Sequence, residues 1–153
     1  DLAAFIRRIK ELGYAVKLDT NGGNPAMVRH LLKEQFLDYI ALDVKASEEA
    51  YPVVCGLHAR WEAVEETLSL LKGSPLPFEV RTTVYPTMQS SDLLRVSTMI
   101  GTVPLWRLNT YRIPDLYKET DTDRIHAPVM EKETIKGWIE ENRERIEALH
   151  VTT

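Results

Sequence analysis

The segment KLDTNGG at residues 17–23 decides the fold, because it describes a strand that ends in a tight polar turn. A similar strand-like segment, IALDVK, follows at residues 40–45. Alternate residues of a strand share a face, so the lysine and aspartate of each segment point to one side and the aliphatic residues to the other. The pattern predicts two neighbouring strands with one charged face, and we expect this face to line a ligand cavity.

Further strand-like runs are separated by amphipathic helical patterns, which places the chain in the α/β class. We expect strands at about residues 14–19, 39–45, 78–85 and 105–112, a long loop at 113–129 and a C-terminal helix at 131–149. Strands that alternate with helices predict a parallel sheet of right-handed βαβ units.

The third and fourth predicted strands also have a polar face, whereas the strands of a doubly wound sheet are apolar on both faces. These polar positions are Glu79, Arg81 and Thr83, and then Arg107, Asn109 and Tyr111. About four parallel strands with outer helices and a polar inner face therefore predict an open, incomplete barrel that holds a ligand on its concave side.

The composition is that of an ordinary globular domain, with 153 residues, 44% hydrophobic and 27% charged. The net charge of −4 provides no basic footprint for nucleic acid. No stretch approaches the ~20 apolar residues of a membrane span, and no signal-peptide pattern is visible, so a cytoplasmic protein is expected. The sequence begins inside a helical pattern, which suggests a piece of a longer protein.

A polar cluster is predicted where the first two strands end, the edge at which α/β folds bind ligands. It contains Asp19, Thr20, Asp43 and Lys45. Two nearby carboxylates repel each other unless a cation lies between them. Lys45 is one candidate for this cation, and a metal ion held by Asp19, the Thr20 hydroxyl, a backbone carbonyl and Asp43 is another. The alternative is a structural network of aspartates and lysines with an Asx turn at Asn21.

Other reactive side chains carry weaker signals. Arg81 is either a clamp for a carboxylate or phosphate, or the structural partner of Glu79 and a nearby aspartate. Cys55 is the single cysteine, and a lone cysteine is most often a small buried hydrophobe. Of the four histidines, His126 in the long loop is the best placed to approach a ligand.

Three motifs in this order resemble the radical S-adenosylmethionine (radical SAM) activating enzymes of glycyl radical enzymes. They are LDTNG at residues 18–22, LDYIALDVK at 37–45 and EVRTTVYP at 79–86. The similarity is strongest to activating proteins of the anaerobic ribonucleoside-triphosphate reductase, with pyruvate formate-lyase activating enzymes as relatives. It runs from residue 1 to about residue 112, and it implies a partial (β/α)6 radical SAM barrel.

The resemblance also implies cofactors. Such enzymes bind a [4Fe-4S] cluster through a CxxxCxxC loop, and the cluster binds S-adenosylmethionine and cleaves it reductively. This sequence contains neither that loop nor the Gly-Gly-Glu-Pro stretch that follows it in the family. The resemblance therefore implies the C-terminal part of such an enzyme, over residues 1–153, which contains no iron–sulfur ligand and is inactive by itself.

Site residues follow from the resemblance position by position. Asp19, Thr20 and Asp43, with the Ala41 carbonyl, match a monovalent-cation site for Na⁺ or K⁺ beside the S-adenosylmethionine carboxylate. Lys45 matches a lysine near that carboxylate, and Asn21 belongs to the same cofactor-binding turn. Arg81 matches a catalytic arginine near the substrate glycine, and Tyr111 and Arg112 fall where the last strand approaches the nucleoside.

The implied function is an oxidoreductase that generates a glycyl radical on a partner enzyme, with flavodoxin or ferredoxin as electron donor. Two alternatives remain open, a radical SAM enzyme acting on a small molecule, similar to 7-carboxy-7-deazaguanine synthase, and a non-enzymatic α/β binding module. Because exposed strand edges pair with other chains, we also expect the first strand to promote self-association.

Overall fold

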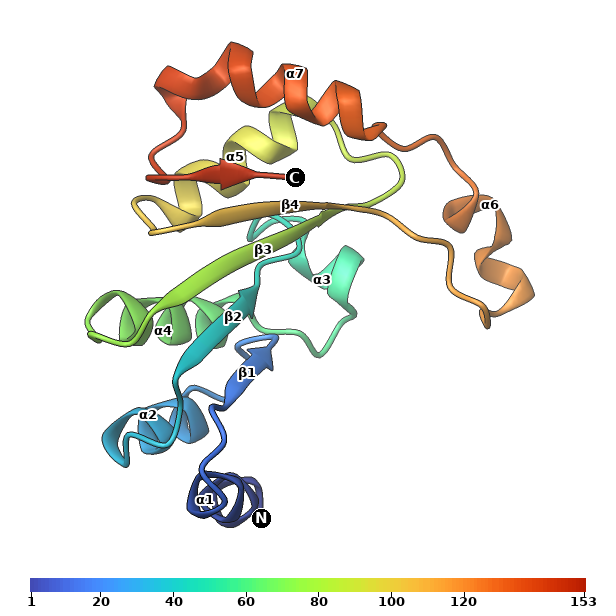
Figure 1. Cartoon of the computed structure of the whole chain (residues 1–153). Coiled ribbons are helices and arrows are strands. Elements are labelled where there is room, and N and C mark those ends of the chain that lie inside the picture. The colour runs from blue at the N-terminus through green and yellow to red at the C-terminus, as the bar shows by residue number, and fades with distance from the viewer.

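A single parallel sheet organises the molecule (Figure 1), whose computed structural model describes all of residues 1–153. The sheet order is β1-β2-β3-β4-β5, and every neighbouring pair is parallel. The strands are β1 (Lys17–Thr20), β2 (Tyr39–Asp43), β3 (Phe78–Val84), β4 (Trp106–Thr110) and β5 (Val151–Thr152). The predicted α/β class with parallel strands and outer helices is confirmed.

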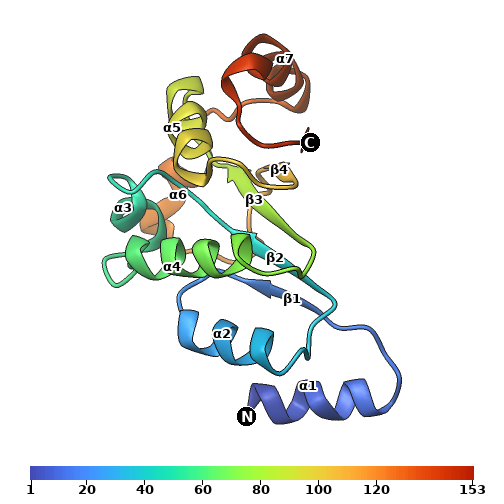
Figure 2. The same ribbon diagram turned by 90° about the vertical axis from the view of Figure 1, so that its left-hand side faces the viewer.

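The helices α2, α4 and α5 lie together on one face of this sheet, and the opposite face has no helical cover (Figure 2). The helices are α1 (Leu2–Glu11), α2 (Pro25–Lys33), α3 (Tyr51–Cys55), α4 (Trp61–Lys72), α5 (Ser90–Ile100), α6 (Thr122–Ile125) and α7 (Lys132–Asn142), with 3-10 helices η1 (Glu119–Asp121) and η2 (Arg143–Arg145). None of them combines the length and apolar character that crossing a bilayer requires.

Local sequence explains where α2 begins after the first strand. The Asn24 side chain accepts a hydrogen bond from the Met27 amide at 3.0 Å and so caps the helix. Pro25 occupies the first turn, where its fixed φ suits a helix and its missing amide hydrogen costs nothing. The helix therefore starts immediately after the polar turn and turns its apolar side toward the sheet.

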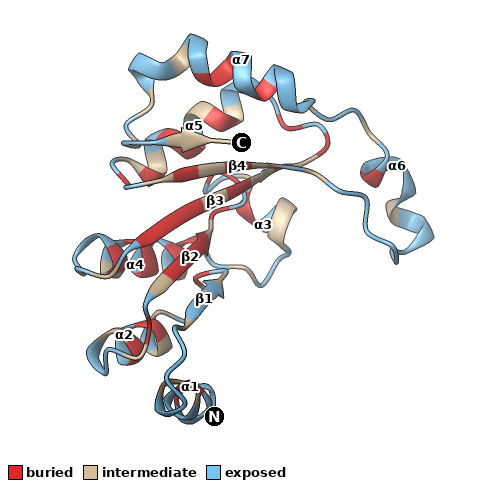
Figure 3. Cartoon of the chain, viewed as in Figure 1, coloured by how far each residue is buried: buried red, intermediate tan, exposed pale blue.

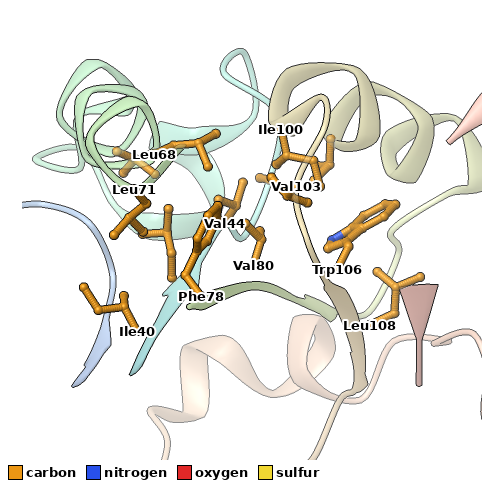
Figure 4. Close-up of a cluster of buried hydrophobic side chains, with 14 of the residues drawn as sticks. Ile40, Val44, Leu68, Leu71, Phe78, Val80, Ile100, Val103, Trp106 and Leu108 are labelled. Carbon is orange, nitrogen blue, oxygen red and sulfur yellow. The ribbon is translucent and has the colours of Figure 1, made fainter. Parts of the chain in front are cut away.

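The core lies between the helices and the apolar face of the sheet. Figure 4 shows Ile40 and Val80 from the strands, and Val44 just after β2, in one cluster with Leu68 and Leu71 of α4. All of these side chains are buried. Figure 3 shows the same distribution, with burial concentrated in β2, β3, β4 and the inner sides of the helices. Because one face is packed in this way, the charged face of each strand must point to the open side.

Several predicted boundaries differ from the structure. The sheet has five strands rather than about four, because β5 has two residues and is too short to show a periodic pattern. The helix expected over 131–149 ends at Asn142, and the chain continues through η2 to β5. The loop expected over 113–129 contains η1 and α6, each a single turn. Likewise, β1 begins at Lys17 and not at residue 14.

Candidate functional site

Charged side chains from β1, β2, β3 and β4 meet on the open face of the sheet. Asp43 is the register partner of Arg81, and Arg81 is the register partner of Arg107. Asp19 on β1 is the register partner of Ala41 on β2. The structure therefore brings Asp19, Asp43 and Arg81 together, as the alternation of faces along the strands predicts.

The Arg81 guanidinium bridges the two aspartates. Its Nη1 donates to Asp19 Oδ2 at 2.8 Å, and its Nε donates to Asp43 Oδ1 at 2.9 Å. The Nη2 atom lies 2.8 Å from the same Asp43 oxygen. The Arg81 side chain is only 20% exposed, compared with 54% for Asp19, so the arginine forms the buried centre of the group.

A second group of charges lies beside the first. Glu79, whose side chain is 5% exposed, accepts hydrogen bonds from Lys17 Nζ at 3.2 Å and from Arg107 Nε at 3.1 Å. Lys17 Nζ also lies 3.5 Å from Asp19 Oδ1 and so joins the two groups. Three carboxylates and three cations thus alternate across the face. Strand-face analysis of the sequence identifies Lys17, Glu79 and Arg107 as polar but does not assign them a site role.

The small side chain of Ala41 makes this arrangement possible. Ala41 lies between Asp19 and Glu79 in the register, and it is fully buried although it belongs to the face without helices. A methyl group leaves room for Arg81 and Lys17 to reach across β2 to their partners. The side chain of Ala41 therefore has a structural role, since its small size leaves space for the ion pairs that cross β2.

The ion pairs shift the ionisation of both partners. Burial raises the pKa of Asp19, but the hydrogen bond and charge of Arg81, together with Lys17, outweigh burial and lower it. Burial lowers the pKa of Arg81, but the hydrogen bonds and charges of Asp19 and Asp43 outweigh that effect and raise it. The pair is therefore fully ionised near neutral pH.

The turn after β1 is held by its own side chains. Thr20 Oγ1 accepts from the Gly22 amide at 3.1 Å, and Asn21 Oδ1 accepts from the Gly23 amide at 3.0 Å. The buried hydroxyl of Thr67 on α4 donates to the Gly22 carbonyl at 2.8 Å. The Asx turn expected at Asn21 is therefore present, and it fixes Thr20 and Asn21 at the carboxyl end of the sheet.

Lys45 does not take part in the aspartate pair. The strand β2 ends at Asp43, so the face alternation no longer applies two residues later, and Lys45 forms no ion pair. The interpretation that Lys45 neutralises Asp19 and Asp43 is wrong, because Arg81 has that position. Lys45 instead lines a cavity of about 640 Å³ together with Asn21 and His58.

A second cavity, of about 570 Å³, is lined by Asp19, Thr20, Asn21 and Asp43. Asn21 borders both cavities and so lies where they adjoin. The lone cysteine lines the first cavity, where burial raises the pKa of the Cys55 thiol. A neutral thiol is a weak nucleophile and a weak metal ligand, which agrees with the structural role expected for Cys55.

The remaining predicted residues lie further along the chain. Because β4 ends at Thr110, Tyr111 and Arg112 follow the strand instead of belonging to it. His126 lies in the segment beyond them, where its Nε2 is 3.0 Å from the Tyr117 hydroxyl. These residues are not joined to the Asp19–Arg81–Asp43 group by any hydrogen bond or ion pair.

Solved structures with the same architecture define the class of fold. A domain of the pyruvate-formate lyase-activating enzyme from Bacteroides vulgatus superposes with a TM-score of 0.69 at 12% identity, covering 97% of this chain and 88% of that chain. Streptococcus suis SuiB, solved with the precursor peptide SuiA, superposes with a TM-score of 0.64 at 12% identity, over 100% of this chain and 35% of SuiB. At this identity the match shows a shared fold.

Sequence comparison adds a curated relative. A Methanocaldococcus jannaschii protein, provisionally named a glycyl-radical enzyme activating enzyme, is 29% identical over 118 residues, which cover 74% of this chain and 49% of that protein. The chain thus spans about half the length of the curated relative that it matches. No protein-family model matches the sequence. The sequence comparison therefore relates this chain to a protein named as an activating enzyme, and the superpositions show that it shares the fold of the two solved proteins.

Proposed function

We propose that this chain is the C-terminal part of a radical SAM activase, an enzyme that cleaves S-adenosylmethionine reductively and generates a glycyl radical on a partner protein. The observation that carries the proposal is the Asp19–Arg81–Asp43 group at the carboxyl ends of parallel strands, on a face without helical cover. The relationship in sequence to a protein named as a glycyl-radical enzyme activating enzyme supports it.

In this proposal Lys45 binds the carboxylate of S-adenosylmethionine. Its ammonium is exposed and has no protein partner, which suits an ammonium that pairs with a ligand. Asn21 lies between the two cavities and positions the cofactor at the turn, while Tyr111 approaches the nucleoside. Arg81 lies near the reacting glycine and holds the surrounding carboxylates in place.

The iron–sulfur cluster does not fit these residues. It would take three cysteine ligands, whereas the 153 residues contain only Cys55, which is half-buried at the end of α3. When bound, the cluster would supply the electron that cleaves S-adenosylmethionine. In the proposal a segment outside these residues holds it, and the chain by itself is inactive.

The partner in this proposal is a polypeptide. The fold relative SuiB was solved with a bound precursor peptide, which supports a polypeptide substrate over a small molecule. The glycyl radical enzyme that we favour is an anaerobic ribonucleoside-triphosphate reductase, with flavodoxin or ferredoxin as the electron donor. This choice depends on the motifs at residues 18–22, 37–45 and 79–86.

Anaerobic reconstitution of the complete protein tests the proposal. The chain is expressed together with the segment that precedes it, loaded with iron and sulfide, and assayed for S-adenosylmethionine cleavage and for the glycyl radical by electron paramagnetic resonance. We expect Lys45→Met to weaken S-adenosylmethionine binding about tenfold or more, since a charged hydrogen bond is worth about 1.5–3 kcal/mol. Lys33→Met, which removes another exposed lysine without an ion pair, serves as the matched control.

The outcomes separate the alternatives. A protein that binds no cluster and cleaves no S-adenosylmethionine would contradict the proposal and favour a binding module. Cleavage without radical transfer to any polypeptide would favour a small-molecule enzyme. If Lys45→Met and Lys33→Met bind S-adenosylmethionine equally well, Lys45 is not part of the binding site. The proposed activity would not be affected by that result.

A further inference from the structure

The guanidinium of Arg81 lies where the sequence predicts an inorganic cation. A Na⁺ or K⁺ ion coordinated by Asp19 and Asp43 would have to lie between the two carboxylates. The structure has the guanidinium there, 2.8 Å from Asp19 Oδ2 and 2.8 Å from Asp43 Oδ1. A guanidinium presents several N–H donors in one plane, so it can serve both carboxylates at the same time.

The charge around the pair is already balanced. Asp19 and Asp43 contribute two negative charges, and Arg81 and Lys17 contribute two positive charges within hydrogen-bond or ion-pair distance. A metal ion inserted beside the guanidinium would meet a like charge and would have to displace it. Because Arg81 is largely buried and approaches Asp43 through two nitrogens, displacement would break several hydrogen bonds at once.

The third expected ligand is not aligned with the pair either, because Thr20 directly follows Asp19 on β1 and its side chain points to the other face of the strand. The Thr20 hydroxyl also accepts a hydrogen bond from the Gly22 amide at 3.1 Å within its own turn. The residues present therefore do not fit a resident monovalent cation as long as Arg81 keeps its position.

We propose that Arg81 is a built-in counterion that makes the Asp19–Asp43 pair independent of inorganic cations, and that removing its charge converts the pair into a monovalent-cation site. The inference concerns the chain without any cofactor. Its test is therefore independent of the proposed function and needs no enzymatic activity.

Thermal unfolding of the chain in different chlorides tests the inference. The midpoint is measured by circular dichroism in sodium, potassium and choline chloride at equal ionic strength, because choline is too bulky to be coordinated by two carboxylates. The variants are Arg81→Gln, which removes the charge, and Arg81→Lys, which keeps it. Arg107→Gln is the matched control, because Arg107 lies on the same face and contacts Glu79 but neither aspartate.

We expect the wild-type midpoint to be the same in all three salts. Arg81→Gln should have a lower midpoint in choline, and sodium or potassium should raise it by about 2–4 °C, since a ligand that binds only the folded state stabilises it. Adding Asp43→Asn to Arg81→Gln should abolish that rise. Arg81→Lys and Arg107→Gln should respond equally to all three salts.

Two results would overturn the inference. The first is a wild-type midpoint that is selectively higher in sodium or potassium, and the second is an Arg81→Gln variant without any selective response. If Arg81→Gln does not fold, sodium NMR line widths of the wild type and of Asp43→Asn decide the question. Equal line widths support the inference, and excess broadening in the wild type that Asp43→Asn removes contradicts it.

Discussion

Gly22 shows how one residue fixes the turn from which the candidate site extends. Its φ of +74° belongs to the left-handed region, and an added Cβ would lie 2.8 Å from Leu42 Cδ1 and 3.2 Å from the Val64 backbone. Both neighbours belong to the core between β2 and α4. Only glycine fits this position without strain or overlap.

Gly22→Ala should therefore destabilise the fold by about 2–5 kcal/mol, since backbone strain adds to overpacking. Gly13→Ala is the matched control, because Gly13 has a φ of +85° and nothing within 4 Å of its added Cβ. The control should lose only about 1–2 kcal/mol of unfolding free energy. Urea unfolding measures both, and equal losses would show that the contact with Leu42 and Val64 has no effect.

Face alternation was enough to predict which single residues share the polar face. It correctly placed Lys17 and Asp19 together and Asp43 on the same side. The alternative that Arg81 is a structural partner of a nearby aspartate is correct, but Glu79 pairs with Lys17 and Arg107 and not with Arg81. Face alternation could not predict that Arg81 bridges two aspartates, because this contact depends on the register Asp43↔Arg81 between strands far apart in sequence. It failed for Lys45 because the end of β2 depends on tertiary packing that the local pattern does not contain.

Neighbouring strands are also tied together by a buried chain of hydrogen bonds. Trp106 Nε1 on β4 donates to Thr82 Oγ1 on β3 at 3.0 Å, and the Thr82 hydroxyl donates to the Val44 carbonyl just after β2 at 2.7 Å. Trp138 on α7 packs edge-on against Trp106, but its buried Nε1 has no partner. The two tryptophans are therefore similar in burial and different in hydrogen bonding.

Trp106→Phe should lower the unfolding free energy by about 1–3 kcal/mol more than Trp138→Phe, because it leaves the buried Thr82 hydroxyl without its donor. Trp138→Phe removes an N–H group that is already unsatisfied, so it loses packing area alone. Denaturant unfolding with tryptophan-independent circular dichroism measures the difference. Equal losses would indicate that packing, and not the hydrogen-bond chain, determines the role of Trp106.

The longer elements could be predicted from the sequence and the shortest ones could not. Helix α2 shows both an amphipathic pattern and a cap, and these signals agree. Strand β5 consists of Val151 and Thr152 alone, and pairing with β4 is what makes it a strand. Elements of this length are created by their neighbours, so no local pattern indicates them.

For the molecule as a whole, the outer edge of β1 is the feature most open to other chains. The sheet order leaves β1 paired only with β2. Beside it, α1 and the residues after it expose Phe5, Leu12 and Tyr14. An unpaired strand edge next to exposed apolar side chains favours association.

We expect the chain to associate as its concentration rises, as measured by sedimentation velocity, and Phe5→Glu to reduce this association. Leu116→Glu is the control, because Leu116 is also apolar and is even more exposed than Phe5, but it lies in the segment between β4 and η1 and not beside β1. A monomer at all concentrations would contradict the prediction. An equal effect of both substitutions would show that the association does not depend on the β1 edge in particular.

The segment between β4 and α7 has a consequence for how this fold can diversify. It extends away from the sheet and carries α6 (Figure 1), while Leu116 within it is 91% exposed. The elements on either side are fixed independently, since β5 pairs with β4 and α7 buries Ile135. Ile125 is buried and the Thr87 amide donates to the Pro128 carbonyl at 2.9 Å, so the C-terminal part of the segment is held in place. The part around Leu116 can change in length and composition without disturbing the sheet, as in surface loops that tolerate insertions. Selection can reshape it for a new partner while the strands and their charges stay the same.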